Sequence, residues 1–87
     1  MKVKIFWKDN CPNCPKAKEL GAELQKNNVD VELFNINEIE GLTEAVSLGV
    51  MSTPSVVIAK DDQELKSWRS EVPQMVEVKR VLDSVRK

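Results

Sequence analysis

The sequence contains no histidine and only two cysteines, so few of its side chains can bind a transition metal. A structural zinc site normally uses four Cys or His ligands, and a closed site of that kind within one chain is excluded. No apolar run approaches the roughly 18–20 residues that are needed to cross a bilayer. The chain also lacks a basic cluster of the kind that binds a nucleic-acid backbone. We therefore expect neither membrane insertion nor nucleic-acid binding.

The remaining composition is that of an ordinary globular chain. The 87 residues carry a net charge of −1, and 41% of them are hydrophobic and 31% charged. A chain of this length has room for one hydrophobic core, so we expect residues 1–87 to form a single domain, and we expect a monomer. The basic N-terminus is followed by an apolar run that is too short for a signal peptide. A cytoplasmic location is therefore expected.

The two cysteines, Cys11 and Cys14, stand three positions apart. A disulfide between them would close so small a loop that chain entropy assigns it only about 2 kcal/mol, and it would hold no distant segments together. The cytosol keeps thiols reduced, so a cysteine pair there is more often catalytic or metal-binding than structural. The expected role of the pair is therefore chemical.

Segments rich in β-branched and aromatic residues predict four strands. They cover residues 3–7, 29–36, 55–59 and 64–68, and Asp61, Asp62 and Gln63 are expected to form the hairpin turn between the last two. The first half should be a right-handed βαβ crossover with parallel strands. We therefore expect an α/β fold with the order β-α-β-α-β-β-α, in which three helices flank the two faces of a four-stranded mixed sheet.

Apolar side chains at three- and four-residue spacing predict the helices. The second helix should be capped by Asn37 and stopped by Gly49. Ser70 or Glu71 should cap the third, with Pro73 in its first turn. The side chains of the second helix that should face the core are Ile39, Leu42, Ala45 and Val46, with Leu48 as a further candidate.

Cys11 stands after the first predicted strand and at the start of the first predicted helix, where a Cys-x-x-Cys pair is typical of redox proteins. Pro12 should lie in the first turn, and Pro15 should lie in that turn or bend it. A helix N-terminus presents unpaired N–H groups and the positive end of the helix dipole, which favour a thiolate. Cys11 should therefore have a lowered pKa and act as the exposed nucleophile. Cys14, one turn later and deeper, should resolve the mixed disulfide.

Other uses of the pair stay open on these grounds alone. Two chains could each contribute a pair to a bridging metal or iron–sulfur cluster, which needs four thiolates. The pair could also be inert and buried, on a domain kept for contact with a partner. The position at a helix start, rather than within an element, favours the redox interpretation.

Two separated segments resemble the thioredoxin–glutaredoxin superfamily. In residues 6–18, the Cys-Pro-x-Cys pattern and the Lys-Ala-Lys stretch soon after it resemble glutaredoxins, and residues 48–58 are similar to the thioredoxin segment that leads through a cis-proline into the third strand. The resemblance covers nearly the whole chain and implies a thioredoxin fold. It also implies that the Thr53–Pro54 bond is cis and faces the Cys11 sulfur, with the Thr53 backbone pairing to a bound substrate chain.

The resemblance to each branch of the superfamily is partial. Lys8 stands where glutaredoxins commonly carry a lysine that meets the glutathione carboxylate, although a solvated loop lysine explains it equally well. Glutaredoxins follow the fourth strand with a Gly-Gly turn, but residues 67–71 contain no glycine, so side chains occupy the space that a peptide backbone would approach. Trp68 and Arg69 resemble the redoxins of ribonucleotide reductase instead. Thioredoxins carry a buried aspartate and a tryptophan where Ile5 and Asn10 stand.

The sequence therefore predicts a thiol–disulfide oxidoreductase that reduces protein disulfides and needs no cofactor besides its reversible Cys11–Cys14 disulfide. Its expected partners are a disulfide-containing protein and a redox-partner reductase. A glutathione-dependent glutaredoxin is the alternative, beside a cluster-bridging or partner-binding module. The residues expected to contact the substrate are Lys8, Pro12, Asn13, Thr53, Pro54 and Trp68.

Overall fold

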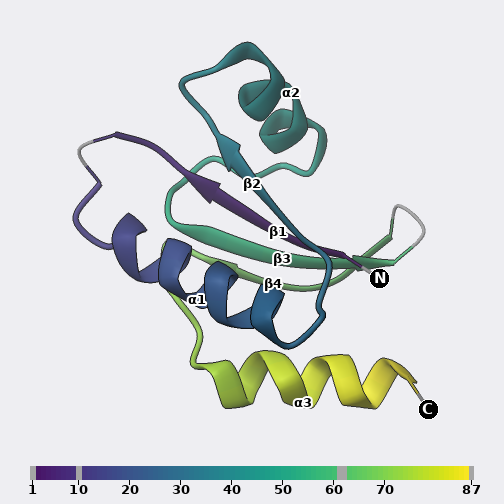
Figure 1. The fold of residues 1–87 in the computed structure, drawn as a ribbon. Coiled ribbons are helices and arrows are strands. Elements are labelled where there is room, and N and C mark those ends of the chain that lie inside the picture. The colour runs from purple at the N-terminus through teal and green to yellow at the C-terminus, as the bar shows by residue number, and fades with distance from the viewer. Residues whose placement is uncertain (1, 10, 61–62, 87) are drawn as a thin grey trace.

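The seven predicted elements are present in the predicted order (Figure 1). The computed structural model describes residues 2–9, 11–60 and 63–86. Its elements are β1 (Lys2–Trp7), α1 (Cys14–Lys26), β2 (Val31–Asn35), α2 (Ile39–Ser47), β3 (Ser55–Lys60), β4 (Gln63–Arg69) and α3 (Met75–Arg86). The hairpin turn expected at Asp61 and Asp62 lies outside the described residues.

The four strands form one mixed sheet in the order β2-β1-β3-β4. β1 runs parallel to β2 and antiparallel to β3, and β3 runs antiparallel to β4. Trp7 pairs with Asn35, Phe6 with Ser55, and Ser55 with Arg69. One edge of the sheet therefore collects the ends of β1, β2 and β4 together with the start of β3.

Helices cover both faces of this sheet, as expected. Figure 1 shows α1 and α3 on one face and α2 on the other. The core beneath α1 and α3 consists of Val3, Ile5, Ala17, Leu20, Leu24, Val56, Ile58, Trp68, Val78 and Leu82. The smaller core beneath α2 consists of Phe6, Ala45, Val50 and Val57, and Phe34 stacks on Phe6 with ring centroids 5.3 Å apart.

The prediction of which face of α2 is buried was correct for Ala45 and wrong for Ile39, Leu42 and Val46. The side chains of Ile39, Leu42 and Val46 are 85%, 51% and 61% exposed. The buried positions are Gly41 and Ala45, which lie four residues apart on one face of the helix. A Cβ at Gly41 would lie 2.1 Å from the carbonyl oxygen of Asn35, so the absence of a side chain lets the helix approach the end of β2. The small residues set the orientation of α2, and its larger apolar residues face outward.

The helix starts also differ from the prediction in detail. α1 begins at Cys14, because the Cys14 N–H donates to the Cys11 carbonyl oxygen at 3.3 Å and residues 11–14 form a turn. Pro12 therefore precedes the helix, whereas Pro15 lies in its first turn as expected.

Side-chain acceptors explain the starts of the other two helices. The N-cap of α2 is Glu38 rather than Asn37, whose N–H donates to Oδ1 of Asn35 at 2.9 Å. α3 begins at Met75, and the Gln74 N–H donates to Oε2 of Glu77 at 2.9 Å, as in a capping box. Ser70, Glu71 and Pro73 accordingly lie before the helix.

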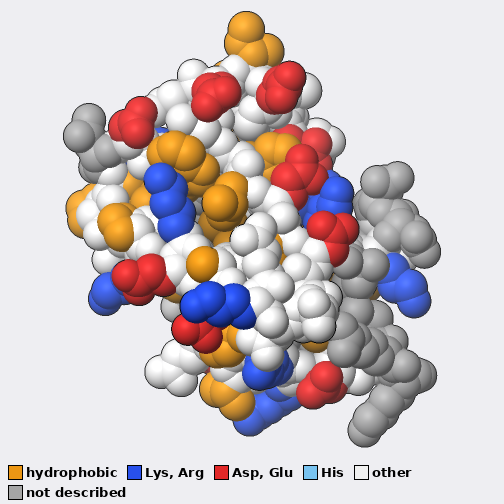
Figure 2. All heavy atoms as spheres, in the orientation of Figure 1, with side chains coloured by type: hydrophobic (Ala, Val, Ile, Leu, Met, Phe, Trp, Pro, Cys, Tyr) orange, Lys and Arg blue, Asp and Glu red, His pale blue; other side chains and the backbone are white. Residues whose placement is uncertain are grey.

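Basic residues are absent from the segment that contains α2. Residues 27–59 contain five of the 14 acidic residues and none of the 13 basic ones. Figure 2 shows acidic side chains on the upper part of the visible face, where α2 lies, with exposed hydrophobic side chains among them. The net charge of −1 therefore conceals a strongly uneven distribution of charge. Among the described helices, none is long and apolar enough to cross a membrane.

Candidate active site

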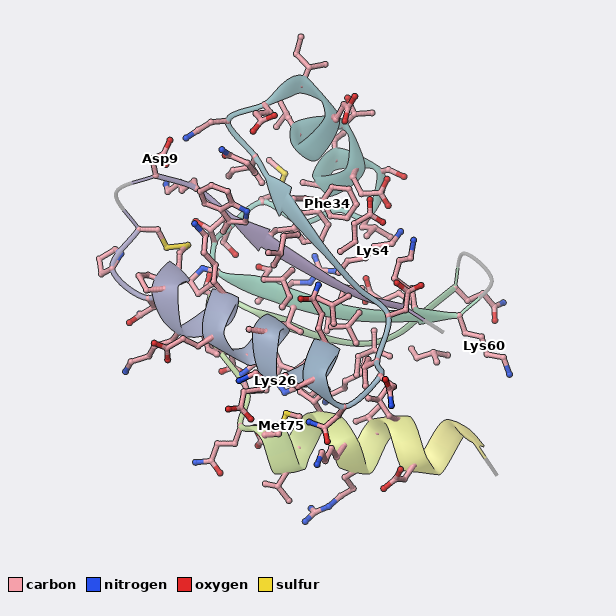
Figure 3. All side chains as sticks on the ribbon, viewed as in Figure 1. Lys4, Asp9, Lys26, Phe34, Lys60 and Met75 are labelled. Carbon is pink, nitrogen blue, oxygen red and sulfur yellow. A yellow bond between two sulfur atoms is a disulfide. The ribbon has the colours of Figure 1, made fainter. Side chains whose placement is uncertain are left out.

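The two cysteines lie at the N-terminal end of α1 and form a disulfide bond with their Cα atoms 5.3 Å apart. Figure 3 shows this bond between the start of α1 and the loop after β1, which carries Asp9. Cys14 is only 2% exposed and belongs to the buried face of α1, whereas Cys11 is partly exposed. The two sulfur atoms therefore differ in access, in the order that their positions in the sequence predict.

The first turn of α1 leaves its positive dipole end without a competing anion. Asn13, the N-cap, makes no side-chain capping hydrogen bond, and the turn contains no acidic residue. A capping oxygen or a carboxylate would neutralise part of the field of the backbone N–H groups. Without them, that field acts on the sulfur atoms and favours a thiolate there.

The loop that contains Pro54 lies at the same edge of the sheet. The Thr53–Pro54 peptide bond is cis, as the family resemblance implied. Pro54 is buried and directly precedes Ser55, which pairs with Phe6 near the end of β1. The hydroxyl oxygen of Thr53 is buried and has no hydrogen-bond partner among the residues that the structure describes. The two segments of the resemblance, which 29 residues separate in the sequence, thus meet at one edge of the sheet.

The other candidate contacts differ in their exposure. Lys8, Pro12 and Asn13 are exposed on the chain around Cys11, and their roles stay predictions. Trp68 is only 7% exposed and packs in the core beneath α1 and α3. Its expected contact with substrate also stays a prediction, and its burial argues against it. Asn10, which stands where thioredoxins carry a tryptophan, lies outside the described residues.

Two arrangements near this edge were not predicted. The Lys18 ammonium lies 3.5 Å from the centroid of the Trp7 ring, so α1 and β1 are joined by a cation–π contact. Arg69 donates hydrogen bonds to the carbonyl groups that follow α2. Neither contact has a signal in the sequence, because each depends on how separate elements pack. In the described part of the chain, no group of three or more His, Cys, Asp or Glu residues could hold a metal ion.

The chain is similar to known thioredoxins along most of its length. The family model for the thioredoxin domain matches residues 1–83. A thioredoxin of Methanocaldococcus jannaschii is 36% identical over 62 residues, which are 70% of this chain and 73% of that protein. A probable thioredoxin of Archaeoglobus fulgidus is 33% identical over 57 residues, which are 64% of this chain and 63% of that protein.

Solved thioredoxin structures share the fold. Thioredoxin 1 from Thermosipho africanus superimposes with a TM-score of 0.71 at 21% identity, covering 99% of this chain and 94% of that one. Thioredoxin O2 from Arabidopsis thaliana, in its oxidised state, gives a TM-score of 0.77 at 19% identity, covering 99% and 75%. With a disulfide-bonded Cys-x-x-Cys pair at the start of α1, the chain belongs to the thioredoxin family and is a thiol–disulfide oxidoreductase.

Proposed function

We propose that this protein reduces disulfide bonds of other proteins, with Cys11 as the attacking thiolate and Cys14 as the resolving thiol. The observation that carries the proposal is the difference in access between the two sulfurs. Cys14 is 2% exposed, so a protein disulfide meets Cys11 first. The bare N-terminus of α1 supports the thiolate form of that residue.

The exchange has two steps. The Cys11 thiolate attacks one sulfur of the substrate disulfide, the substrate S–S bond breaks, and the departing sulfur leaves as a thiolate that takes up a proton. Cys14 then loses its proton and attacks the Cys11 sulfur, which releases the second substrate thiol and forms the Cys11–Cys14 disulfide. Two electrons pass to the substrate, and a redox-partner reductase then supplies two electrons that reduce the Cys11–Cys14 disulfide again.

The substrate chain is proposed to lie along the sheet edge beside Pro54. The start of β3 at Ser55 leaves residues 52–54 beyond the last strand pair, next to the segment that leads to Cys11. An extended chain can pair its backbone with Thr53 there, and the buried Thr53 hydroxyl has an unused bonding capacity at this point. Lys8, Pro12 and Asn13 are proposed as further contacts because they are exposed around Cys11.

A protein reductase is proposed as the electron source in place of glutathione. Arg69 stands where glutaredoxins carry the Gly-Gly turn, and its side chain is engaged with the end of α2. A Gly-Gly turn leaves room for a peptide backbone to approach, and residues 67–71 contain no glycine. We further propose that the protein acts as a cytoplasmic monomer, with residues 1–87 as one domain and no cofactor besides its own disulfide.

Serine variants of the two cysteines test these roles. Pre-reduced wild-type protein should reduce insulin, and Cys11→Ser should remove this activity because the attacking sulfur is lost. Cys14→Ser should accumulate a stable mixed disulfide with insulin through Cys11, visible as a mass adduct under non-reducing conditions. The two variants are matched controls for each other. Trapping by Cys11→Ser instead of Cys14→Ser would reverse the roles, and insulin reduction by Cys11→Ser would refute the proposal.

A further inference from the structure

Arg69, the last residue of β4, reaches the end of α2 with its side chain. Its Nη1 donates a hydrogen bond to the carbonyl oxygen of Gly49 at 2.6 Å, and its Nη2 donates to that of Leu48 at 3.4 Å. Nη2 also lies 3.1 Å from Oε1 of Glu64 on the same strand. The guanidinium therefore connects β4 with the residues that follow α2.

The end of α2 needs these donors because helix termini leave carbonyl groups without a partner. Gly49 has a left-handed φ of 71°, and the N–H groups of Gly49 and Val50 donate to the carbonyls of Val46 and Ala45 at 3.1 and 2.8 Å, which is a Schellman motif. Arg69 bonds to the carbonyls of Leu48 and Gly49, just after the helix. The last turn of α2 contains no basic residue, so Arg69 also places a positive charge at the negative end of the helix dipole.

The backbone of Arg69 pairs with the other end of the loop between α2 and β3. In the β3–β4 ladder Arg69 pairs with Ser55, the first residue of β3. The Ser55 hydroxyl in turn donates to the carbonyl oxygen of Ser52 at 2.7 Å. Residues 50–54 thus follow Gly49, whose carbonyl oxygen bonds to the Arg69 side chain. They precede Ser55, which pairs with the Arg69 backbone.

We infer that Arg69 is a positioning residue that fixes residues 50–54, and thereby holds Thr53 and Pro54 in place for a protein substrate. The expected effect on substrate reduction rests on the proposed function, whereas the fixing of residues 50–54 does not. A loop that is already ordered loses less conformational entropy when a substrate chain pairs with it. A small disulfide that reaches Cys11 without pairing with this loop gains nothing from the ordering.

Hydrogen exchange tests the structural part. In Arg69→Gln, the amides of residues 50–53 and 55 should exchange about tenfold faster than in wild type, because charge-assisted hydrogen bonds to Leu48 and Gly49 are lost. Arg80→Gln, which removes the same charge from an exposed position on α3, should leave these amides unchanged. Equal exchange in the two variants would overturn the inference. The measurement needs no substrate and stands whatever activity the protein has.

Two substrates test the kinetic part. The rate constant of pre-reduced Arg69→Gln should fall about tenfold with insulin but stay within about twofold of wild type with 5,5′-dithiobis(2-nitrobenzoic acid). With insulin, the rate constant of Arg69→Lys should lie between those of wild type and Arg69→Gln. An ammonium is a point donor and lacks the fork geometry that reaches two carbonyls. Arg80→Gln should match wild type with both substrates.

The outcomes separate positioning from general damage. An equal loss with both substrates would assign Arg69 to overall stability and overturn the positioning role, and so would an unchanged rate with insulin. If wild type itself fails to reduce insulin, the proposed function fails, and the exchange rates of residues 50–53 and 55 still decide whether Arg69 fixes the loop.

Discussion

Gly21 in α1 and Gly41 in α2 both lie where a Cβ would be crowded, but by different kinds of atoms. At Gly41 a Cβ would meet the backbone of Asn35, with the carbonyl oxygen at 2.1 Å and the carbonyl carbon at 2.6 Å. At Gly21 it would meet the ends of side chains, the nearest being Cδ1 of Ile5 at 3.0 Å. A backbone cannot move without shifting β2, whereas a side-chain terminus can rotate. The same substitution should therefore have different effects at the two positions.

We expect Gly41→Ala to lower the free energy of unfolding by about 2–3 kcal/mol, since overpacking outweighs the gain in helix propensity. Gly21→Ala is the matched control and should change it by less than about 1 kcal/mol, because the propensity gain offsets a small shift of Ile5. Urea unfolding measures both. Equal effects would show that α2 can move away from Asn35 at little cost.

The cysteines and Pro54 illustrate what single residues reveal in a sequence. Cys11, Cys14 and the cis-proline segment were found from spacing and motif, because their chemistry requires particular residue types. Arg69 was noted only as part of a segment without the Gly-Gly pattern and, with Trp68, for a resemblance to the redoxins of ribonucleotide reductase. Its bonds to Leu48 and Gly49 depend on the register of β3 with β4 and on where α2 ends, and no local pattern encodes either.

At the level of elements, α2 shows the limit of apolar spacing as a guide to burial. Its apolar residues occur on more than one side of the helix, so their spacing alone does not decide which side faces the sheet. The close approach at Gly41 decides it, and this leaves Val46 outward while Val50, just after the helix, is 4% exposed. Hydrophobic side chains near each other in sequence thus contribute very differently to stability.

The valine pair around the end of α2 gives a direct test of this orientation. Val50→Ala should lower the free energy of unfolding by about 1.5–3 kcal/mol because it leaves a void beneath α2. Val46→Ala should change it by no more than about 0.5 kcal/mol, because Val46 is 61% exposed. Chemical denaturation of the two variants measures the difference. A larger loss at Val46 would mean that the predicted face of α2 is the buried one after all.

At the scale of the whole molecule, the order of elements and the mixed sheet were predictable because each strand and helix has a local signal. The helix starts were less predictable from the sequence. The side chains of Asn35 and Glu77 accept hydrogen bonds from backbone N–H groups near the starts of α2 and α3, where other residues were expected as caps. The predicted substrate contact at Trp68 illustrates a different difficulty. Trp68 is the one buried side chain of β4, and its direction follows from the pairing of the strand rather than from its neighbours in sequence.

The thioredoxin fold also hosts glutathione-dependent enzymes, and the whole site must be tested against that alternative. We expect Cys14→Ser to show less than about a tenth of the turnover that a monothiol glutaredoxin gives with a glutathione mixed disulfide, because residues 67–71 lack the Gly-Gly turn that lets a peptide backbone approach. The measurement is the rate of glutathione-coupled reduction of hydroxyethyl disulfide. Wild-type protein recycled by dithiothreitol is the control for an intact site, and full turnover with glutathione would establish the alternative.

The absence of basic residues from residues 27–59 has a consequence that extends beyond any contact. With five negative charges there and a surplus of four positive charges in the remainder, the molecule carries a permanent electric dipole moment, which the ion pairs of Lys2 with Glu32 and of Lys4 with Glu44 reduce. In the field of a charged macromolecule such a dipole experiences a torque. The protein therefore rotates toward a preferred orientation while the two surfaces are still separated by water, and dissolved salt weakens this effect over about 8–10 Å.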